Sequence, residues 1–269
     1  MLIFVGYAAG MCHDPEAAPP IHGEPRTAIA RAETHTPPSA DGTLLAAYSA
    51  HPSEALGAPV LVLPDNRGLS GFYEAFCRRL AEQGHPATAI DYFARTAGPD
   101  HRTRDAAFPF IEHLFKTTRE TLYADIEAGL GHLRGRHPGR RHAVRTVGFC
   151  FGGRQAFLTA SSRFAVAGAI GFHGFPGELF GSPGPTQPTA DFTTPVLGLF
   201  GGADEGIPSA VVADFAAALD EAAVPHELVT FPGMPHGFFE LEPDADTAVC
   251  TEAWHRVLDF LRDPDITGR

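Results

Sequence analysis

The sequence predicts a single α/β domain built on a doubly wound, mainly parallel sheet with helices on both faces. Short apolar runs alternate with longer amphipathic segments along most of the chain, which is typical of repeated strand and helix units. The chain has 269 residues, of which 44% are hydrophobic, and this is enough for one large core. We therefore expect one domain over residues 41–262, an irregular extension over 1–40 and a short tail over 263–269.

The expected strands are short apolar runs bounded by turn residues. The first follows the turn signal Asp41-Gly42 and is a candidate edge strand over residues 43–49. Residues 13–40 are rich in Pro, His, Ala and Glu and show no periodicity, so we expect them to be irregular. The remaining runs predict strands over residues 60–63, 87–90, 144–147, 166–170, 196–200 and 227–231.

The longer segments between these runs carry apolar residues at helical spacing. They predict helices over residues 72–83, 122–134, 154–161, 209–222 and 248–261. Alternation of this kind implies right-handed crossovers between parallel strands, with ligand sites beyond the carboxyl ends of the strands. The segment 94–119 contains Pro99, Pro109 and several aromatic residues. It is too long for a simple connection and is a candidate lid or pocket wall.

Composition narrows the class of partner. The formal net charge is −12, which argues against nucleic acid or an anionic membrane surface as the main partner, because both are polyanions. No apolar run is long enough to cross a bilayer, and the apolar residues 1–10 lack the basic segment of a signal peptide. We therefore expect a cytoplasmic protein, a monomer or small homo-oligomer, that acts on a small molecule.

The cysteines and histidines do not form a recognisable metal motif. Cys12, Cys77, Cys150 and Cys250 show no C-x-x-C spacing and lie far apart, so neither a zinc site nor a disulfide framework is expected. The fourteen histidines include no H-E-x-x-H motif. We expect reduced thiols, no metal and no cofactor.

One thiol stands where a strand turns sharply into a helix. The sequence GFCFGG at residues 148–153 has the form G-x-nucleophile-x-G, in which the glycines let the strand and the helix pack closely around a strained turn. Free cysteines are often buried, so a structural role for Cys150 is the competing interpretation. A base and an acid further along the chain would favour the nucleophile.

An acidic residue and a histidine each follow a later strand. Asp204 lies just past the strand expected at 196–200, and His236 lies in a Gly- and Pro-rich loop after the strand expected at 227–231. Taken singly, Asp204 is equally well a turn or helix-cap residue, and His236 is one histidine among many. Parallel strands bring their carboxyl ends to one edge, however, and the order nucleophile, acid, histidine predicts a catalytic triad with Cys150.

These motifs resemble those of the dienelactone hydrolase family, the branch of the α/β-hydrolases with a cysteine nucleophile. The resemblance covers about residues 41–261. It rests on the segments 148–153, 201–204, 235–238, 60–68 and 89–95. It implies the α/β-hydrolase fold and a carboxymethylenebutenolidase-like hydrolysis of carboxylic esters or lactones.

The chemistry implied by these residues is acyl transfer through a thioester. His236, oriented by Asp204, would take the proton of Cys150, since only the thiolate attacks a carbonyl well and an ordinary cysteine has a pKa of about 8.5. The N-terminus of the following helix also favours the thiolate. The backbone amides of Phe151 and Asn66 are expected to form the oxyanion hole, and water activated by His236 then releases the acid.

Four further residues bear on the substrate. A glutamate that holds the resting thiol in the family is replaced by Asp65, which either gates the thiol or pairs with Arg67 or Arg95. Arg95 matches a substrate-contacting arginine of the family. A carboxylate-binding arginine is replaced by Glu240, which we expect to repel a carboxylate-bearing lactone unless its loop points it away. Arg154 either binds an anion or forms a structural ion pair.

The leading hypothesis is a Cys-His-Asp hydrolase of carboxylic esters or lactones. Glu240 and the many phenylalanines favour, as the alternative, a related esterase or thioesterase that acts on a bulkier neutral or natural-product ester. The scaffold alone also admits another class, a lyase or cyclase or a catalytically silent binding module.

Overall fold

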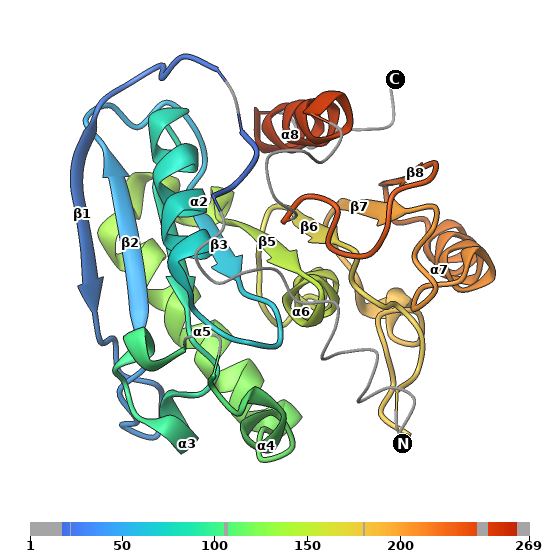
Figure 1. Cartoon of the computed structure of the whole chain (residues 1–269), viewed down its shortest axis with the longest axis horizontal. Helices are drawn as coiled ribbons and strands as arrows, with labels where there is room; N and C mark the ends of the chain where they lie inside the picture. Colours follow the sequence, from blue (N-terminus) through green and yellow to red (C-terminus); the bar gives the residue numbers. More distant parts are fainter. Residues whose placement is uncertain (1–17, 22, 105–106, 180, 241–246, 263–269) are drawn as a thin grey trace.

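The structure, a computed structural model, contains one eight-stranded sheet (Figure 1). It describes residues 18–21, 23–104, 107–179, 181–240 and 247–262. The strand order is β1-β2-β4-β3-β5-β6-β7-β8. Strand β2 runs antiparallel to both of its neighbours, and all the other pairings in this sheet are parallel. The predicted fold class is confirmed.

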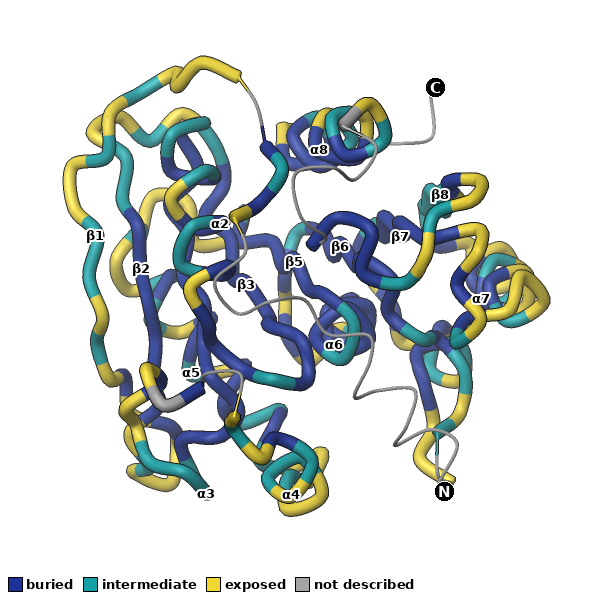
Figure 2. The backbone as a smooth tube through the Cα atoms, viewed as in Figure 1, coloured by how far each residue is buried: buried dark blue, intermediate teal, exposed yellow. Residues whose placement is uncertain are grey.

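Strands and helices alternate along the described chain. The strands are β1 (Ile29–His35), β2 (Ala47–Pro52), β3 (Val60–Leu63), β4 (Ala87–Ile90), β5 (Arg145–Phe149), β6 (Ala169–Phe172), β7 (Val196–Gly201) and β8 (His226–Phe231). The helices are α2 (Gly71–Glu82), α3 (Ala94–Ala97), α4 (Phe110–Leu114), α5 (Arg119–Arg136), α6 (Phe151–Leu158), α7 (Ser209–Glu221) and α8 (Thr247–Arg262). Strands β3 to β7 are buried along their whole length, as parallel strands covered on both faces must be (Figure 2).

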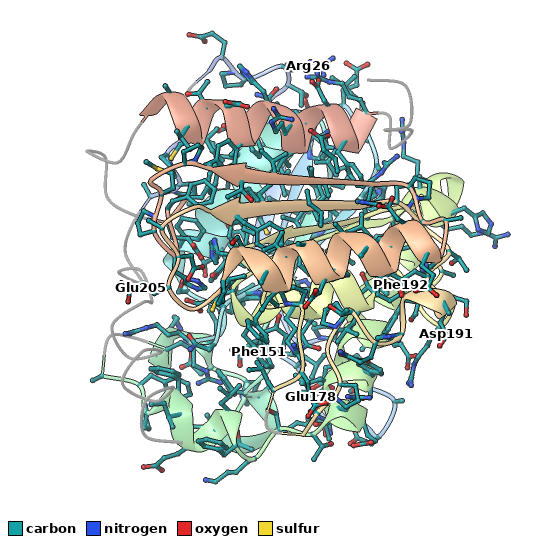
Figure 3. All side chains as sticks on the ribbon, turned by 90° about the vertical axis from the view of Figure 1, so that its right-hand side faces the viewer. Arg26, Phe151, Glu178, Asp191, Phe192 and Glu205 are labelled. Atoms are coloured by element: carbon teal, nitrogen blue, oxygen red, sulfur yellow. The ribbon has the colours of Figure 1, made fainter. Side chains whose placement is uncertain are left out.

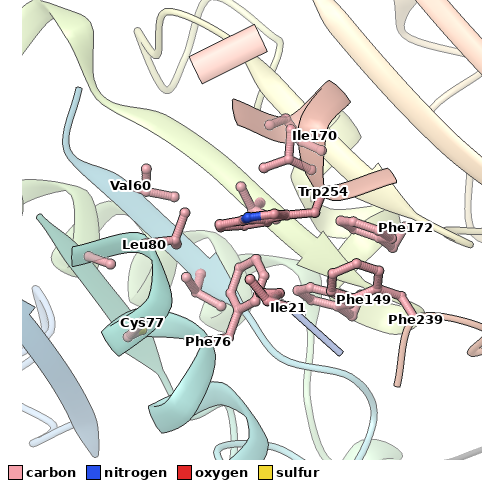
Figure 4. Packing of buried hydrophobic residues seen from close by; sticks show 14 of the residues in the cluster. Ile21, Val60, Phe76, Cys77, Leu80, Phe149, Ile170, Phe172, Phe239 and Trp254 are labelled. Atoms are coloured by element: carbon pink, nitrogen blue, oxygen red, sulfur yellow. The ribbon is translucent and has the colours of Figure 1, made fainter. Parts of the chain in front are cut away.

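Two layers of helices cover the sheet. Helices α2 and α8 pack on one face, where the rings of Phe76 and Trp254 lie 5.8 Å apart above Phe149 and Phe172 of the central strands (Figure 4). The apolar sides of α5, α6 and α7 bury the other face. In the described part of the chain, every helix is too short or too polar to traverse a bilayer.

The prediction of irregular structure over residues 1–40 is wrong for one segment, because Ile29–His35 forms strand β1. This strand lies at the edge of the sheet and pairs with β2 alone, so most of its side chains are exposed or half-buried (Figure 2). An edge strand of this kind needs no apolar run, and the sequence pattern therefore gave no signal for it. Residues 1–17 and the expected tail, 263–269, lie outside the described residues.

Several predicted boundaries shift by a few residues. The edge strand expected at 43–49 is β2, which begins at Ala47 and lies second from the edge. The helix expected from residue 154 is α6, which begins directly after Cys150. Its first turn contains Gly152 and Gly153, and glycine is a poor helix former, so the helical pattern becomes visible only after them.

Candidate active site

Cys150 occupies the sharp turn between β5 and α6. Its backbone has φ 51° and ψ −111°, a conformation that side-chain-bearing residues rarely adopt. The close packing around it requires glycine on both sides. A Cβ atom on Gly148 would lie 2.0 Å from the carbonyl oxygen of Gly152, and one on Gly152 would lie 2.1 Å from that of Leu63. Strain of this kind, held by surrounding backbone, is characteristic of functional positions.

His236 and Asp204 form a hydrogen-bonded pair beyond the ends of β8 and β7. Nδ1 of His236 lies 2.7 Å from Oδ2 of Asp204, and the other carboxylate oxygen accepts a 2.8 Å bond from the amide of Gly206. Asp204 is buried, and its carboxylate accepts this bond. The bond therefore holds the ring with its proton on Nδ1. Nε2 of His236 is buried and has no hydrogen-bond partner among the described residues. It is therefore available to accept a proton.

The environment of His236 keeps its ring neutral. Burial lowers the pKa of His236 below its ordinary value, and the nearby His173 adds to this effect. The hydrogen bond and charge of Asp204 act in the opposite direction but do not reverse the shift. A neutral imidazole at neutral pH is the state that a general base requires.

A cavity of about 360 Å³ is lined by five of the residues that the sequence predicts for the site. Cys150, His236, Asn66, Phe151 and Arg154 all line it, and Asp204 lies behind His236. Figure 3 labels Phe151, the first residue of α6. Most of the remaining wall is apolar: Phe110, Ile111, Leu114, Phe115, Leu122, Leu158, Phe175, Leu179 and Ile207. Residues from 110 to 119 form one side, so the pocket wall expected over 94–119 is confirmed for this part of the segment, whereas none of the described residues from 94 to 109 lines the cavity.

The loop after β3 reaches the start of α6. A Cβ atom on Gly152 would be only 2.2 Å from the carbonyl oxygen of Pro64, so this loop and the helix N-terminus are in direct contact. Asn66 and Phe151, the two residues whose amides are expected to bind an oxyanion, line the cavity from these two elements. The arrangement is compatible with two backbone donors beside Cys150.

Asp65 and Arg95 lie outside the cavity lining. Asp65 is buried; its Oδ1 accepts a 2.8 Å bond from the amide of Arg67, and its own amide donates to Tyr73 Oη at 2.9 Å. Arg95 forms a bidentate pair with Asp125 and a second ion pair with Asp41. Arg95 thus binds the segment after β4 to α5, and its side chain lies away from the cavity.

Glu240 is buried beneath the site, with 3% of its surface exposed, and it is not among the cavity-lining residues. Its Oε1 accepts a 3.5 Å bond from Tyr73 Oη. Its Oε2 lies 2.8 Å from Nε2 of His173, an ion-pair distance outside hydrogen-bond geometry. The loop therefore turns Glu240 away from the cavity, which removes the reason to expect repulsion of a carboxylate there.

His173 is a site residue that the sequence reasoning missed. It directly follows β6, has φ 36°, lines the cavity, and its ring centroid is 4.5 Å from that of His236. The rule that singled out Asp204 and His236, a polar residue just past the end of a parallel strand, applies equally to His173. That signal was present in the sequence.

Comparison with known proteins shows which family has this architecture. The family model described as "Dienelactone hydrolase family" matches residues 45–264. The chain belongs to the dienelactone hydrolase family. Two relatives, from Yersinia pestis and Methylorubrum extorquens, are both named "Putative carboxymethylenebutenolidase". The first is 30% identical and the match covers 82% of this chain and 84% of the relative. The second is 29% identical, with 84% and 78% covered.

A solved structure agrees with the family. The crystal structure of a "Putative Dienelactone Hydrolase" from Klebsiella pneumoniae is similar with a TM-score of 0.76 and 28% identity, covering 87% of this chain and 98% of that one. The dienelactone hydrolase family has the α/β-hydrolase fold, and the sheet described above is that fold. As a member of this family, the protein is a hydrolase of the lactone or ester type.

Proposed function

We propose that this dienelactone hydrolase family member hydrolyses carboxylic esters and lactones with Cys150 as nucleophile, His236 as base and Asp204 as the acid that orients the base. The observation that carries the proposal is the shared cavity. It is lined by Cys150, at a strained turn, and by His236, whose Nδ1 is held by Asp204 at 2.7 Å and whose Nε2 has no partner among the described residues. A strained nucleophile and an oriented base that open into one cavity are the groups that acyl transfer requires.

The proposed reaction has two steps. Nε2 of His236 takes the proton of the Cys150 thiol, and Sγ attacks the ester carbonyl. The C–O bond to the alcohol then breaks, the alcohol leaves with the proton from His236, and a thioester remains on Cys150. Water, deprotonated by His236, attacks the thioester and releases the carboxylic acid and the thiol. With a lactone, the alcohol stays tethered and the product is a single ring-opened acid.

The oxyanion of each tetrahedral intermediate is expected between the backbone amides of Asn66 and Phe151. Phe151 is the first residue of α6, so its amide is among those at a helix N-terminus that have no partner within the helix. Fixed donors of this kind stabilise a developing negative charge without reorganisation. We further propose that the enzyme acts in the cytoplasm, without a cofactor, as a monomer or small homo-oligomer on small-molecule substrates.

Replacement of the nucleophile tests this proposal. With a panel of 4-nitrophenyl esters, Cys150→Ala is expected to lower kcat/KM by about a thousandfold or more, since removal of a triad member leaves only binding and the oxyanion hole. The control is Cys77→Ala, which removes a buried thiol of α2 that does not line the cavity. Equal rates for wild type and Cys150→Ala would show that Cys150 is not the nucleophile. If the wild type turned over no ester or lactone, the result would favour a silent binding module.

A further inference from the structure

Two arginine side chains meet in the wall of the catalytic cavity. Nη2 of Arg154 and Nη2 of Arg119 both donate to the carbonyl oxygen of Pro183, at 3.1 and 3.2 Å. They also share Ser182, whose carbonyl oxygen accepts from Arg154 at 3.2 Å and whose hydroxyl accepts from Arg119 at 3.0 Å. The two guanidinium groups are therefore within two hydrogen-bond lengths of each other.

Among the described residues, no carboxylate pairs with either of these charges. Arg154 is only 6% exposed, and its guanidinium donates to backbone carbonyl groups alone: those of Phe175, Gly177, Ser182 and Pro183. The described residues that line the cavity include no Asp or Glu. Neither arginine takes part in an ion pair within the described residues. A buried cation without a counterion favours an anionic ligand.

The two charges act on each other. Burial, together with the charge of Arg119, lowers the pKa of Arg154 to about 10, so Arg154 stays protonated at neutral pH while its cationic form is disfavoured. An anion placed against both groups would relieve this repulsion.

Arg119 has donors left for such an anion. Its Nη2 makes both of its hydrogen bonds, whereas its Nε and Nη1 bond to none of the described residues. Arg119 is exposed, and it lines both the catalytic cavity and an adjoining cavity of about 630 Å³. Asp191, whose charge would repel an anion, lines the adjoining cavity but not the catalytic one. The favourable place for an anion is therefore the wall that the two cavities share.

We propose that Arg119, backed by the buried charge of Arg154, binds a carboxylate of the substrate, whose apolar body fills the cavity between this wall and Cys150. A guanidinium group matches a carboxylate in charge and planar geometry, and the cavity wall between is largely apolar. Recognition of the charge thus comes from the segment around Ser182 and from α5 rather than from Arg95 or position 240. The inference rests on the proposed hydrolysis of esters and lactones.

A matched pair of substrates tests the inference by kinetics. The two are the 4-nitrophenyl monoester of adipic acid and the same ester with its free carboxylate replaced by carboxamide. Wild type is expected to prefer the carboxylate about tenfold in kcat/KM at low salt, and Arg119→Gln to abolish this preference. Added salt should weaken the preference. The control is Arg136→Gln at the other end of α5, which should keep it.

Two kinetic results would overturn the inference while leaving the proposed hydrolysis intact. One is turnover of both esters by wild type without preference for the carboxylate. The other is a preference that survives in Arg119→Gln. Binding to Cys150→Ala separates recognition from chemistry: calorimetry should show hexanoate binding about tenfold tighter than hexanamide, even if no ester is turned over. Equal affinities would contradict the role of the arginines.

Discussion

At the scale of single residues, His236 is the group on which the proposed chemistry depends. It donates from Nδ1 to buried Asp204, it lies beside the ring of His173, and its Nε2 atom is left without a partner among the described residues. Burial and His173 lower its pKa, and Asp204 raises it. The net effect favours the neutral ring, which can act as a base.

The lowered pKa of His236 fixes the sign of the pH dependence. The neutral ring is the active form, and it persists as the pH falls until the pH reaches the lowered pKa. The acid limb of kcat/KM for a neutral ester is therefore expected below the ordinary imidazole value of about 6.5. Asp204→Asn removes an interaction that raises this pKa, so the acid limb should shift to lower pH. The rate should also fall by about a hundredfold to ten-thousandfold. A limb at about pH 7 or above in the wild type would contradict this account.

Replacement of Glu240 is expected to affect the stability of the protein more than its preference for charged substrates. It is buried against His173 and Tyr73, so Glu240→Arg would force a larger cation next to His173 and lower the free energy of unfolding by about 3 kcal/mol. Glu240→Gln keeps the shape and should cost about 1 kcal/mol. Urea unfolding of both variants measures the difference. An arginine variant as stable as wild type, with a new preference for carboxylates, would show that position 240 faces the substrate.

At the scale of elements, the turn between β5 and α6 depends on backbone packing that no side chain can enter. Gly148→Ala and Gly152→Ala would each place a methyl group about 2 Å from backbone oxygen, and backbone cannot give way locally. We expect losses of about 3 kcal/mol or more in the free energy of unfolding. Gly131→Ala in α5 is the control, because its Cβ would meet no atom within 4 Å. In Gly131→Ala, the replacement of a helical glycine should raise the free energy of unfolding by about 0.5–1 kcal/mol. Thermal unfolding of the three variants checks the contrast, and a mild Gly152→Ala would refute it.

The elements that could be predicted from the sequence are those whose burial leaves a pattern. Strands β3, β4 and β7 are buried throughout and therefore appear as apolar runs. Strand β1 was missed because it lies at the edge of the described sheet and its side chains are exposed or half-buried, so they form no apolar run. The start of α6 was placed late because two glycines hide its first turn.

At the scale of the whole molecule, the sheet order brings Cys150, Asp204 and His236 to one edge. Strands β5, β7 and β8 are mutually parallel, so their carboxyl ends lie on the same side, and this much follows from the alternation of elements. The sequence could not predict that Arg95 would turn toward Asp125, that Glu240 would lie beneath the cavity, or that Arg119 and Arg154 would share one carbonyl oxygen. These are contacts between distant segments, and no local pattern encodes them.

The central claim is that Cys150 becomes acylated during turnover, and peptide mapping of the enzyme quenched during hydrolysis of a slow 4-nitrophenyl ester tests it most directly. The account predicts a mass increase equal to the acyl group on the peptide that contains Cys150, removed by hydroxylamine as a thioester is, and absent from Cys150→Ala. Steady turnover by Cys150→Ala, or an acyl group found on another residue while Cys150 stays unmodified, would contradict it.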